Sequence, residues 1–174
     1  MKDRSGEVSI KGLTNNLKIN DGSGGLYIDG LDGSLDLVDH SGELRIKNVN
    51  WESEDPELKT VKVLDHSGEL ILEKVAGDLS IKDYSGEIIL KKTKGPLSIN
   101  DTSGGISVRD HVGDSRVDDA SGEITISKID GSVTLWDTSG GISVTDATKD
   151  VHLKRDGSGE FYTSKIQGTV KKGR

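Results

Sequence analysis

Carboxylates and imidazoles that recur at a fixed spacing are the residues of this chain most able to do chemistry. The tetrapeptide Asp-x-Ser-Gly occurs nine times along the 174 residues. In two successive copies the variable residue is a histidine: His40 follows Asp39, and His66 follows Asp65. Histidine nitrogens and carboxylate oxygens are common ligands of divalent cations. These four residues are therefore candidate metal ligands, although we favour the alternative in which the histidines stack on the surface and neither a metal nor another cofactor is held.

The aspartates by themselves suggest calcium. Repeat-in-toxin proteins form coils from glycine-rich nonapeptides and bind calcium through aspartates in the turns. In that pattern an aspartate stands two residues after a glycine. The equivalent position here is Leu, Ile, Val or Phe in nearly every half-repeat, as at Leu26 and Leu35. The calcium pattern therefore does not match, and weak cation binding at an acidic corner is the interpretation that stays open.

A structural role explains why the aspartates are repeated. An Asp side chain accepts hydrogen bonds from the backbone amides that follow it in a turn, and glycine tolerates the positive φ that such a turn needs. We therefore expect turns at the motifs, with the carboxylates on an acidic edge of the molecule. We also expect the turn amides to lower their pKa values inside the stack, so that acid destabilises the fold. The expected turn residues are Asp21, Asp39, Asp65, Asp83, Asp101, Asp119, Asp137 and Asp156.

Catalysis is not indicated by any set of side chains. No serine stands out from the repeated motif, and the remaining histidines, His111 and His152, occupy unrelated positions in their repeats. Covalent catalysis requires a nucleophile beside a base. We therefore expect a protein without enzymatic activity.

An insertion at residues 50–57 interrupts the repeat and is the candidate binding site. Loops that interrupt a repeat architecture often carry binding functions. The insertion combines an aromatic residue with acidic residues, and its candidate binding residues are Trp51, Glu52, Glu54, Asp55 and Glu57. In the alternative interpretation, Trp51 lies against the neighbouring sheet and excludes water from it.

The spacing of the motifs indicates the elements that must position these residues. Successive motif glycines lie 18 residues apart in most of the chain, and a second glycine commonly follows nine residues after the first, as Gly95 follows Gly86. The second and fourth residues after each of these positions are aliphatic, as at Leu97 and Ile99. A period of two is typical of a β-strand. Half-repeats of this length leave no room for helices.

Short strands at a constant spacing predict an all-β fold in which each coil stacks on the next. We expect a right-handed, single-chain parallel β-solenoid of about nine 18-residue coils with two strands per coil, because parallel crossovers are right-handed. Its two sheets would face one another about 10 Å apart. The whole chain, residues 1–174, is expected to form a single domain with an insertion loop at 50–57.

The composition limits the classes of partner. The chain is 31% hydrophobic and 3% aromatic with a formal net charge of −7, so we do not expect nucleic acid as a partner. It contains no cysteine, which excludes a disulfide framework. We find neither an apolar signal segment nor a transmembrane run and expect no membrane insertion by this segment. The chain is then either a cytoplasmic protein or a domain of a longer exported protein.

The repeated pattern x-Leu-x-Ile-x-Asp-x-Ser-Gly-x-Ile-x-Ile, as in residues 97–108, resembles the bacterial adhesin-like repeat family known as toastrack domains. The resemblance covers nearly the whole chain. It implies a β-solenoid that is often attached to membrane segments in cell-envelope and envelope-stress proteins, and it implies no catalytic residues. We therefore expect a non-enzymatic binding or assembly scaffold of a bacterial cell-envelope system, with a protein or cell-surface partner. The alternative is a repeat adhesin that binds glycans or a cell surface, with or without a dependence on cations.

Overall fold

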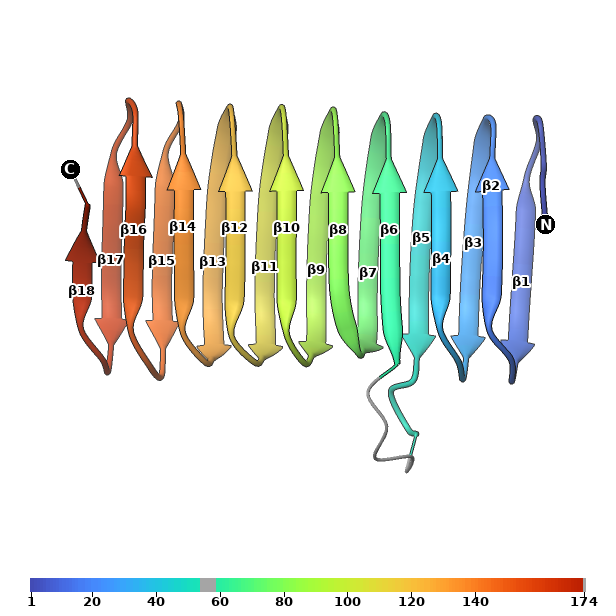
Figure 1. The fold of residues 1–174 in the computed structure, drawn as a ribbon, viewed down its shortest axis with the longest axis horizontal. Coiled ribbons are helices and arrows are strands. Elements are labelled where there is room, and N and C mark those ends of the chain that lie inside the picture. Colours follow the sequence, from blue (N-terminus) through green and yellow to red (C-terminus); the bar gives the residue numbers. More distant parts are fainter. Residues whose placement is uncertain (54–58, 174) are drawn as a thin grey trace.

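The computed structural model describes residues 1–53 and 59–173, and the regular secondary structure of these residues consists of β-strands alone. Each coil contains one odd-numbered strand and one even-numbered strand (Figure 1). The odd-numbered strands are β1 (Val8–Leu13), β3 (Gly24–Leu31), β5 (Gly42–Val49), β7 (Gly68–Ala76), β9 (Gly86–Lys94), β11 (Gly104–Val112), β13 (Gly122–Asp130), β15 (Ile142–Ala147) and β17 (Phe161–Ile166). The even-numbered strands are β2 (Leu17–Asp21), β4 (Leu35–Asp39), β6 (Thr60–Asp65), β8 (Asp78–Asp83), β10 (Leu97–Asp101), β12 (Ser115–Asp119), β14 (Val133–Asp137), β16 (Val151–Asp156) and β18 (Val170–Lys172).

Two parallel sheets face one another across the interior. The odd-numbered strands form one 9-stranded sheet in sequence order, and the even-numbered strands form the other. Equivalent residues of successive coils are paired, as Leu26 is with Leu44 and Leu44 with Leu70. In Figure 1 the even-numbered strands run upward in front of the downward-running odd-numbered strands, and the coils advance from right to left, so the path is right-handed. The predicted parallel β-solenoid with two strands per coil is confirmed.

The interior is filled by the side chains that the period of two directs inward. Leu35 and Leu37 of β4 are at most 1% exposed, whereas Asp36 between them lies on the outer face. Burying one such aliphatic side chain contributes about 1.5–3 kcal/mol. The apolar side chains that pack against this core but are only partly buried all belong to the first or the last coil: Ile10, Leu13, Leu17, Phe161 and Ile166.

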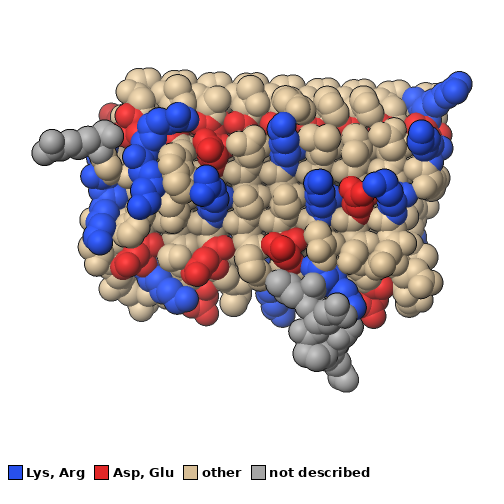
Figure 2. Space-filling model, in the orientation of Figure 1, with Lys and Arg blue, Asp and Glu red and all other residues tan. Residues whose placement is uncertain are grey.

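The outer face of the even-numbered sheet carries charges of both signs. Figure 2 shows Lys and Arg interspersed with Asp and Glu over this face. Some of them form ion pairs between neighbouring coils, such as Lys18 with Asp36 at 2.5 Å, and Arg116 lies over the ring of Trp136 at 4.0 Å from its centroid. Exposed pairs of this kind contribute little to stability. The aliphatic interior therefore supplies most of it.

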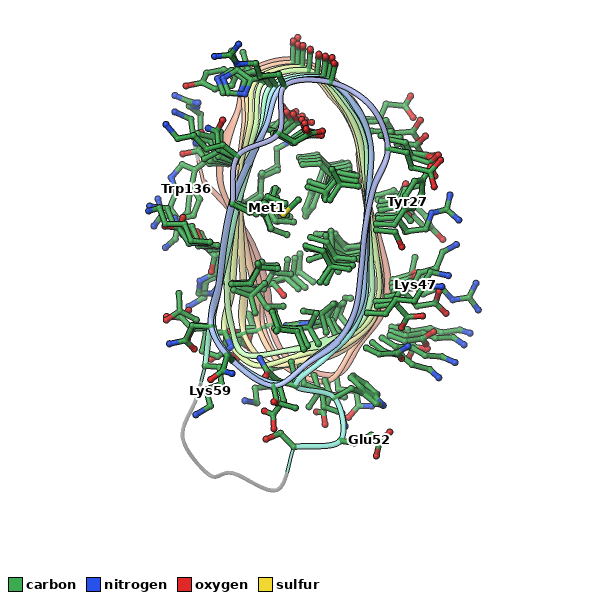
Figure 3. The ribbon with its side chains drawn as sticks, turned by 90° about the vertical axis from the view of Figure 1, so that its right-hand side faces the viewer. Met1, Tyr27, Lys47, Glu52, Lys59 and Trp136 are labelled. Carbon is green, nitrogen blue, oxygen red and sulfur yellow. The ribbon has the colours of Figure 1, made fainter. Side chains whose placement is uncertain are left out.

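The bottom corner of each coil, where an odd-numbered strand ends, requires a left-handed residue. In β11 two consecutive residues, Arg109 and Asp110, lie on the outer side, and the next residue, His111, is buried. This change of phase is accommodated by a positive φ of 57° at Asp110, in the left-handed region of the backbone map. Viewed along the long axis, the side chains of successive coils superimpose as columns (Figure 3). The same corner position is left-handed at Gly12, Gly30, Asn48, Lys74, Lys92, Lys128, Asp146 and Lys165.

The top corner, formed by the Asp-x-Ser-Gly motif, requires glycine. Gly104 has a φ of 137°, and a Cβ atom there would lie 1.6 Å from the carbonyl oxygen of Gly86 in the preceding coil. The backbones of successive coils approach too closely at this point for any side chain. This contact explains why the last residue of the motif is the same in every repeat.

Candidate functional site

The Asp-x-Ser-Gly motifs form the turns at the top corner and also link neighbouring coils. The Oδ1 atom of Asp101 accepts hydrogen bonds from the backbone amides of Thr102 at 2.7 Å and Ser103 at 3.3 Å. The Ser103 hydroxyl donates a hydrogen bond to the backbone carbonyl of Tyr84, one coil earlier, at 3.1 Å. The motif therefore closes its own turn through the aspartate and joins the preceding coil through the serine. Equivalent serine hydrogen bonds are made by Ser67, Ser85 and Ser121.

Seven of the nine motif aspartates point into the interior, and those of the first and last motifs, Asp3 and Asp156, are partly exposed. The expected acidic edge of aspartates is therefore wrong. The reason is the period of two: Leu35, Leu37 and Asp39 occupy alternate positions of β4 and share its inner face. The glutamates that follow the motif glycines, such as Glu43 and Glu69, do lie on the outer face. Among the described aspartates, those at most 3% exposed are Asp21, Asp39, Asp65, Asp83, Asp101, Asp119 and Asp137.

Burial raises the pKa of six of these carboxyl groups. It is the largest cause of the shift, and the negative charge of neighbouring aspartates adds to it, so the pKa rises to about 6 at Asp65, Asp101 and Asp119. The turn amides lower the pKa, but by less than burial raises it. The expected lowering of the pKa values is therefore wrong, because a carboxylate loses its hydration when the side chain enters an apolar interior. The pKa is likewise raised at Asp39, Asp83 and Asp137.

The histidines of the motif, His40 and His66, stack on the outer surface. Their ring centroids are 4.7 Å apart and their planes differ by 5°, and the Tyr84 ring extends the stack at 5.1 Å from His66. Each Nδ1 atom lies 2.8 or 2.9 Å from a backbone carbonyl oxygen of the preceding coil. Parallel rings direct their Nε2 lone pairs in parallel, so the two nitrogens do not converge on one cation.

The four candidate metal ligands are therefore not brought together. The carboxyl groups of Asp39 and Asp65 are buried inside the coil, whereas the rings of His40 and His66 lie outside it. Within the described ranges, no group of three or more His, Asp or Glu side chains has the geometry to hold a metal ion. The stack of rings at this corner replaces the hypothesis of a His–Asp metal centre.

The insertion begins after β5, where the side-chain amide of Asn50 takes the place of a backbone hydrogen-bond partner in the coil. In a regular bottom corner, the second glycine donates its N–H to a backbone carbonyl of the next coil, as Gly95 does to Val112 at 2.8 Å. At the insertion, Gly33 N–H donates instead to the side-chain Oδ1 of Asn50 at 2.8 Å, and Asn50 Nδ2 donates to the Gly33 carbonyl at 3.0 Å. Asn50 is only 9% exposed. Its amide group therefore closes the coil at the root of the loop.

Two of the candidate binding residues, Trp51 and Glu52, follow this root. The Trp51 side chain is half-buried, and the Lys94 ammonium group lies 3.8 Å from the centroid of its ring. Glu52 is exposed. The other candidates of the insertion, Glu54, Asp55 and Glu57, lie outside the described residues.

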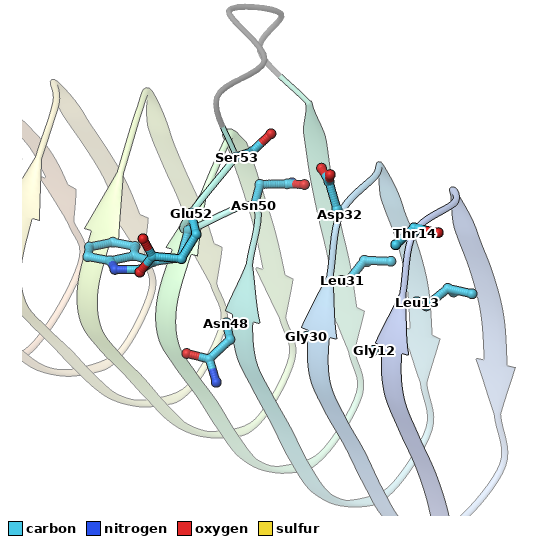
Figure 4. A pocket seen from close by; sticks show the side chains of 11 residues that line it. Gly12, Leu13, Thr14, Gly30, Leu31, Asp32, Asn48, Asn50, Glu52 and Ser53 are labelled. Carbon is cyan, nitrogen blue, oxygen red and sulfur yellow. The ribbon is translucent and has the colours of Figure 1, made fainter.

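A pocket of about 370 Å³ opens at the bottom corner, between the root of the insertion and the first two coils (Figure 4). Leu13 and Leu31 give it an apolar lining. Gly12 and Gly30 leave it open, because they occupy the left-handed corner position where a later coil carries a long side chain such as Lys74. The sequence analysis missed these residues, although the two glycines at a position that is charged in most later repeats were a usable signal.

The polar lining of the pocket is acidic. Asp32 and Glu52 both line it, and neither carboxylate forms an ion pair with a described side chain. At its rim, Asn48 Nδ2 donates a hydrogen bond to Asp29 Oδ1 at 2.6 Å. An apolar floor with two unpaired carboxylates at the edge is complementary to a ligand that combines an apolar group with a cation or with hydrogen-bond donors.

A second titratable group, His111, is buried at the bottom corner of a later coil. Its Nδ1 atom lies 2.8 Å from the hydroxyl oxygen of Thr93, and burial lowers the pKa of the imidazole to about 4. His111 is therefore neutral at physiological pH, and it fills the position that Val75 and Ile129 occupy in other coils. It is a core residue and not part of the pocket beside the insertion.

None of the described residues forms a helix that is long and apolar enough to cross a membrane. The chain matches no protein-family model, and it shows no significant similarity to a curated protein or to a solved structure.

Proposed function

We propose that this protein is a non-enzymatic binding scaffold of a bacterial cell-envelope system and that its partner binds in the pocket beside the insertion. The observation that carries the proposal is that the pocket coincides with the interruption of the repeat. The lining side chains come from the root of the insertion and from the corners of the first coils. Because registered strands hold these corners, the site is preorganised and little order has to be gained on binding.

The chemistry of the pocket favours binding over catalysis. Its described lining residues include two carboxylates but no histidine, cysteine or lysine, so the imidazole, thiol and amine groups that commonly act as base or nucleophile are not among them. The half-buried indole of Trp51 offers a large, rigid contact surface of the kind that dominates binding energy at interfaces. The unpaired Asp32 and Glu52 select for a partner that carries Lys, Arg or other donors.

A role in the cell envelope is supported by the resemblance of the Asp-x-Ser-Gly repeats to toastrack domains. In such a system a straight, rigid rod separates its attachment point from its binding site by a fixed distance. The coils climb by about 4.8 Å each, and the two sheets contain nine strands each, so the rod is on the order of 40 Å long.

The proposal is tested by changing Trp51 and Glu52, which are candidate binding residues of the insertion and also line the pocket. The double variant Trp51→Ala, Glu52→Gln should lose most of its binding to a partner purified from solubilised bacterial envelope proteins, with Kd raised at least about tenfold. The matched control is Trp136→Ala. Trp136 is also half-buried beneath a cationic side chain, but it lies on the sheet face away from the pocket.

Equal losses in the site variant and in Trp136→Ala would refute the pocket as the binding site. Retention of a glycan in an array experiment, with loss of binding when calcium is chelated, would replace the scaffold by the cation-dependent adhesin. Turnover of a substrate that disappears with Glu52→Gln would refute the non-enzymatic role.

A further inference from the structure

The buried aspartates form one continuous column along the top corner. They are paired in register from coil to coil, as Asp39 is with Asp65 and Asp65 with Asp83. Neighbouring strands lie about 4.7–4.9 Å apart, so a modest tilt of each side chain brings successive carboxyl groups within hydrogen-bond distance. The column comprises, among the residues described, Asp21, Asp39, Asp65, Asp83, Asp101, Asp119 and Asp137.

In every member of this column at least one carboxyl oxygen has no partner. The Oδ1 atom usually accepts from a turn amide, as Asp119 does from Ser121 N–H at 3.1 Å. The Oδ2 atom is buried and makes no hydrogen bond. An isolated buried acceptor is costly, and a buried unpaired charge is more so. The aspartates with an unpartnered Oδ2 are Asp21, Asp39, Asp65, Asp83, Asp101, Asp119 and Asp137.

No described cationic side chain neutralises the column from within the interior. The facing sheet contributes aliphatic side chains, such as Leu44, Leu70 and Ile88. Glutamates of the odd-numbered strands lie on the outer face, as do the charged residues between the inward positions of the even-numbered strands, for example Lys62 and Lys82. Other titratable or charged groups near the column include the surface rings of His40 and His66, Tyr84 beside them, Arg155, Asp156, which pairs with Lys172, and Asp3, whose N–H donates to the Asn20 carbonyl beside Asp21.

We propose that the column is a proton-binding site of the folded protein, in which protons taken from water bridge the unpartnered oxygens of neighbouring carboxyl groups. A protonated carboxyl group is a donor, and the carboxyl oxygen of the adjacent coil accepts its hydrogen bond. Each bridge satisfies two buried oxygens, removes one negative charge and requires no other atoms. A calcium ion is a poor substitute, because it takes six to eight oxygen ligands, whereas each coil offers about one free oxygen amid aliphatic side chains.

The sign of the resulting pH dependence follows from the direction of the shifts. The pKa of Asp65, Asp101 and Asp119 rises from 3.8 to about 6 on folding, so at about pH 5 folding takes up about three protons at these residues. The stabilisation is fully present below the pKa of the unfolded state, 3.8. It is lost as the pH rises through about 6, which makes the rod more stable in mild acid than at neutral or alkaline pH.

The experiment compares an inward and an outward aspartate that are adjacent in the chain. Asp119→Asn supplies an uncharged amide that donates and accepts hydrogen bonds without taking up a proton from water, so it should raise the melting temperature at about pH 8 and flatten its dependence on pH. Asp118→Asn removes the same charge from the outer face of β12, where Asp118 lies 3.8 Å from Arg155. This control should leave the pH dependence unchanged.

Two measurements on the unsubstituted protein keep the proposal testable even if a variant does not fold. Potentiometric titration of folded and urea-unfolded protein should show more bound protons in the folded state at about pH 5. The Cγ resonances of labelled aspartates should report protonated carboxyl groups there. Equal proton binding by the two states, or carboxylate resonances throughout the column, would overturn the proposal. So would a melting temperature at about pH 8 that rises with added calcium or potassium and loses that response in Asp119→Asn, because a cation would then be the neutralising group.

Discussion

Ser98 and Ile99 are neighbours in β10, yet they contribute very differently to stability. Ile99 is 1% exposed, whereas the Ser98 side chain faces solvent. Replacing a buried Ile by Ala removes its transfer free energy and leaves a cavity, so Ile99→Ala should lower the free energy of unfolding by about 2–5 kcal/mol. Ser98→Ala should change it by less than about 0.5 kcal/mol. Urea denaturation of the two variants measures both values, and equal losses would contradict the assignment of inner and outer positions.

For the aspartates, the charge of the side chain predicts a position on the surface, whereas the alternation along the strand predicts a position in the interior. The structure agrees with the alternation. The charge of Asp39 favours the surface, but its position two residues after Leu37 places it inside. The turn hydrogen bonds were predictable from the Asp-x-Ser-Gly motif. The raised pKa values were not, because they follow from burial, and burial of a charged residue is rare enough that composition argues against it.

At the scale of the elements, the junction between β5 and the insertion depends on one side chain. Asn50→Ala leaves Gly33 N–H and C=O without their side-chain partner in a buried corner. Each unsatisfied group costs about 1–3 kcal/mol, so we expect a loss of at least that size in the free energy of unfolding. The matched control is Asn100→Ala, an exposed asparagine of β10, which should be nearly neutral in the same denaturation experiment.

Shortening the insertion beyond Asn50 should have little effect on folding. Loop-closure entropy changes slowly with loop length, and the rungs on either side, β4 and β6, are already in register. Replacing residues 52–57 by two glycines should therefore leave the melting temperature nearly unchanged. A cooperative loss of structure in this variant would show that the insertion is part of the folding unit.

The pocket beside the insertion could not be predicted from the pattern of strands and loops in the sequence. The insertion itself was predictable, because it changes the spacing of the motifs. The cavity arises where small residues at the left-handed corner, Gly12 and Gly30, meet the first residues of the loop. Those residues are separated in the sequence and come together only through the stacking of the coils, so the pocket could not be deduced from a single repeat.

At the scale of the whole molecule, the fold was predictable because one coil determines the rest. The motif glycines set the period, and the aliphatic positions set the phase of both strands. Each coil contacts mainly its neighbours, so stability is a sum of similar interfaces. The first and last coils have a neighbour on one side only, and their apolar residues Ile10 and Phe161 are only partly buried.

This arrangement predicts a gradient of local stability along the rod. Amide hydrogen exchange should be slowest in β8 to β11 and fastest in β1, β2, β17 and β18, because opening an end coil breaks one interface and opening a central coil breaks two. Hydrogen-exchange mass spectrometry of overlapping peptides measures the gradient. Uniform protection from end to end would show that the molecule opens as a single unit.

The hydrogen bonds between coils have a mechanical consequence. They connect strands that lie across the long axis of the rod (Figure 1), so they run approximately parallel to that axis. A tensile force applied along the axis therefore loads one interface after another, and the coils peel away singly at low force. Compression or bending is resisted instead by the packed aliphatic interior. The molecule is thus built as a strut that maintains a distance under load and yields readily when its two ends are pulled apart.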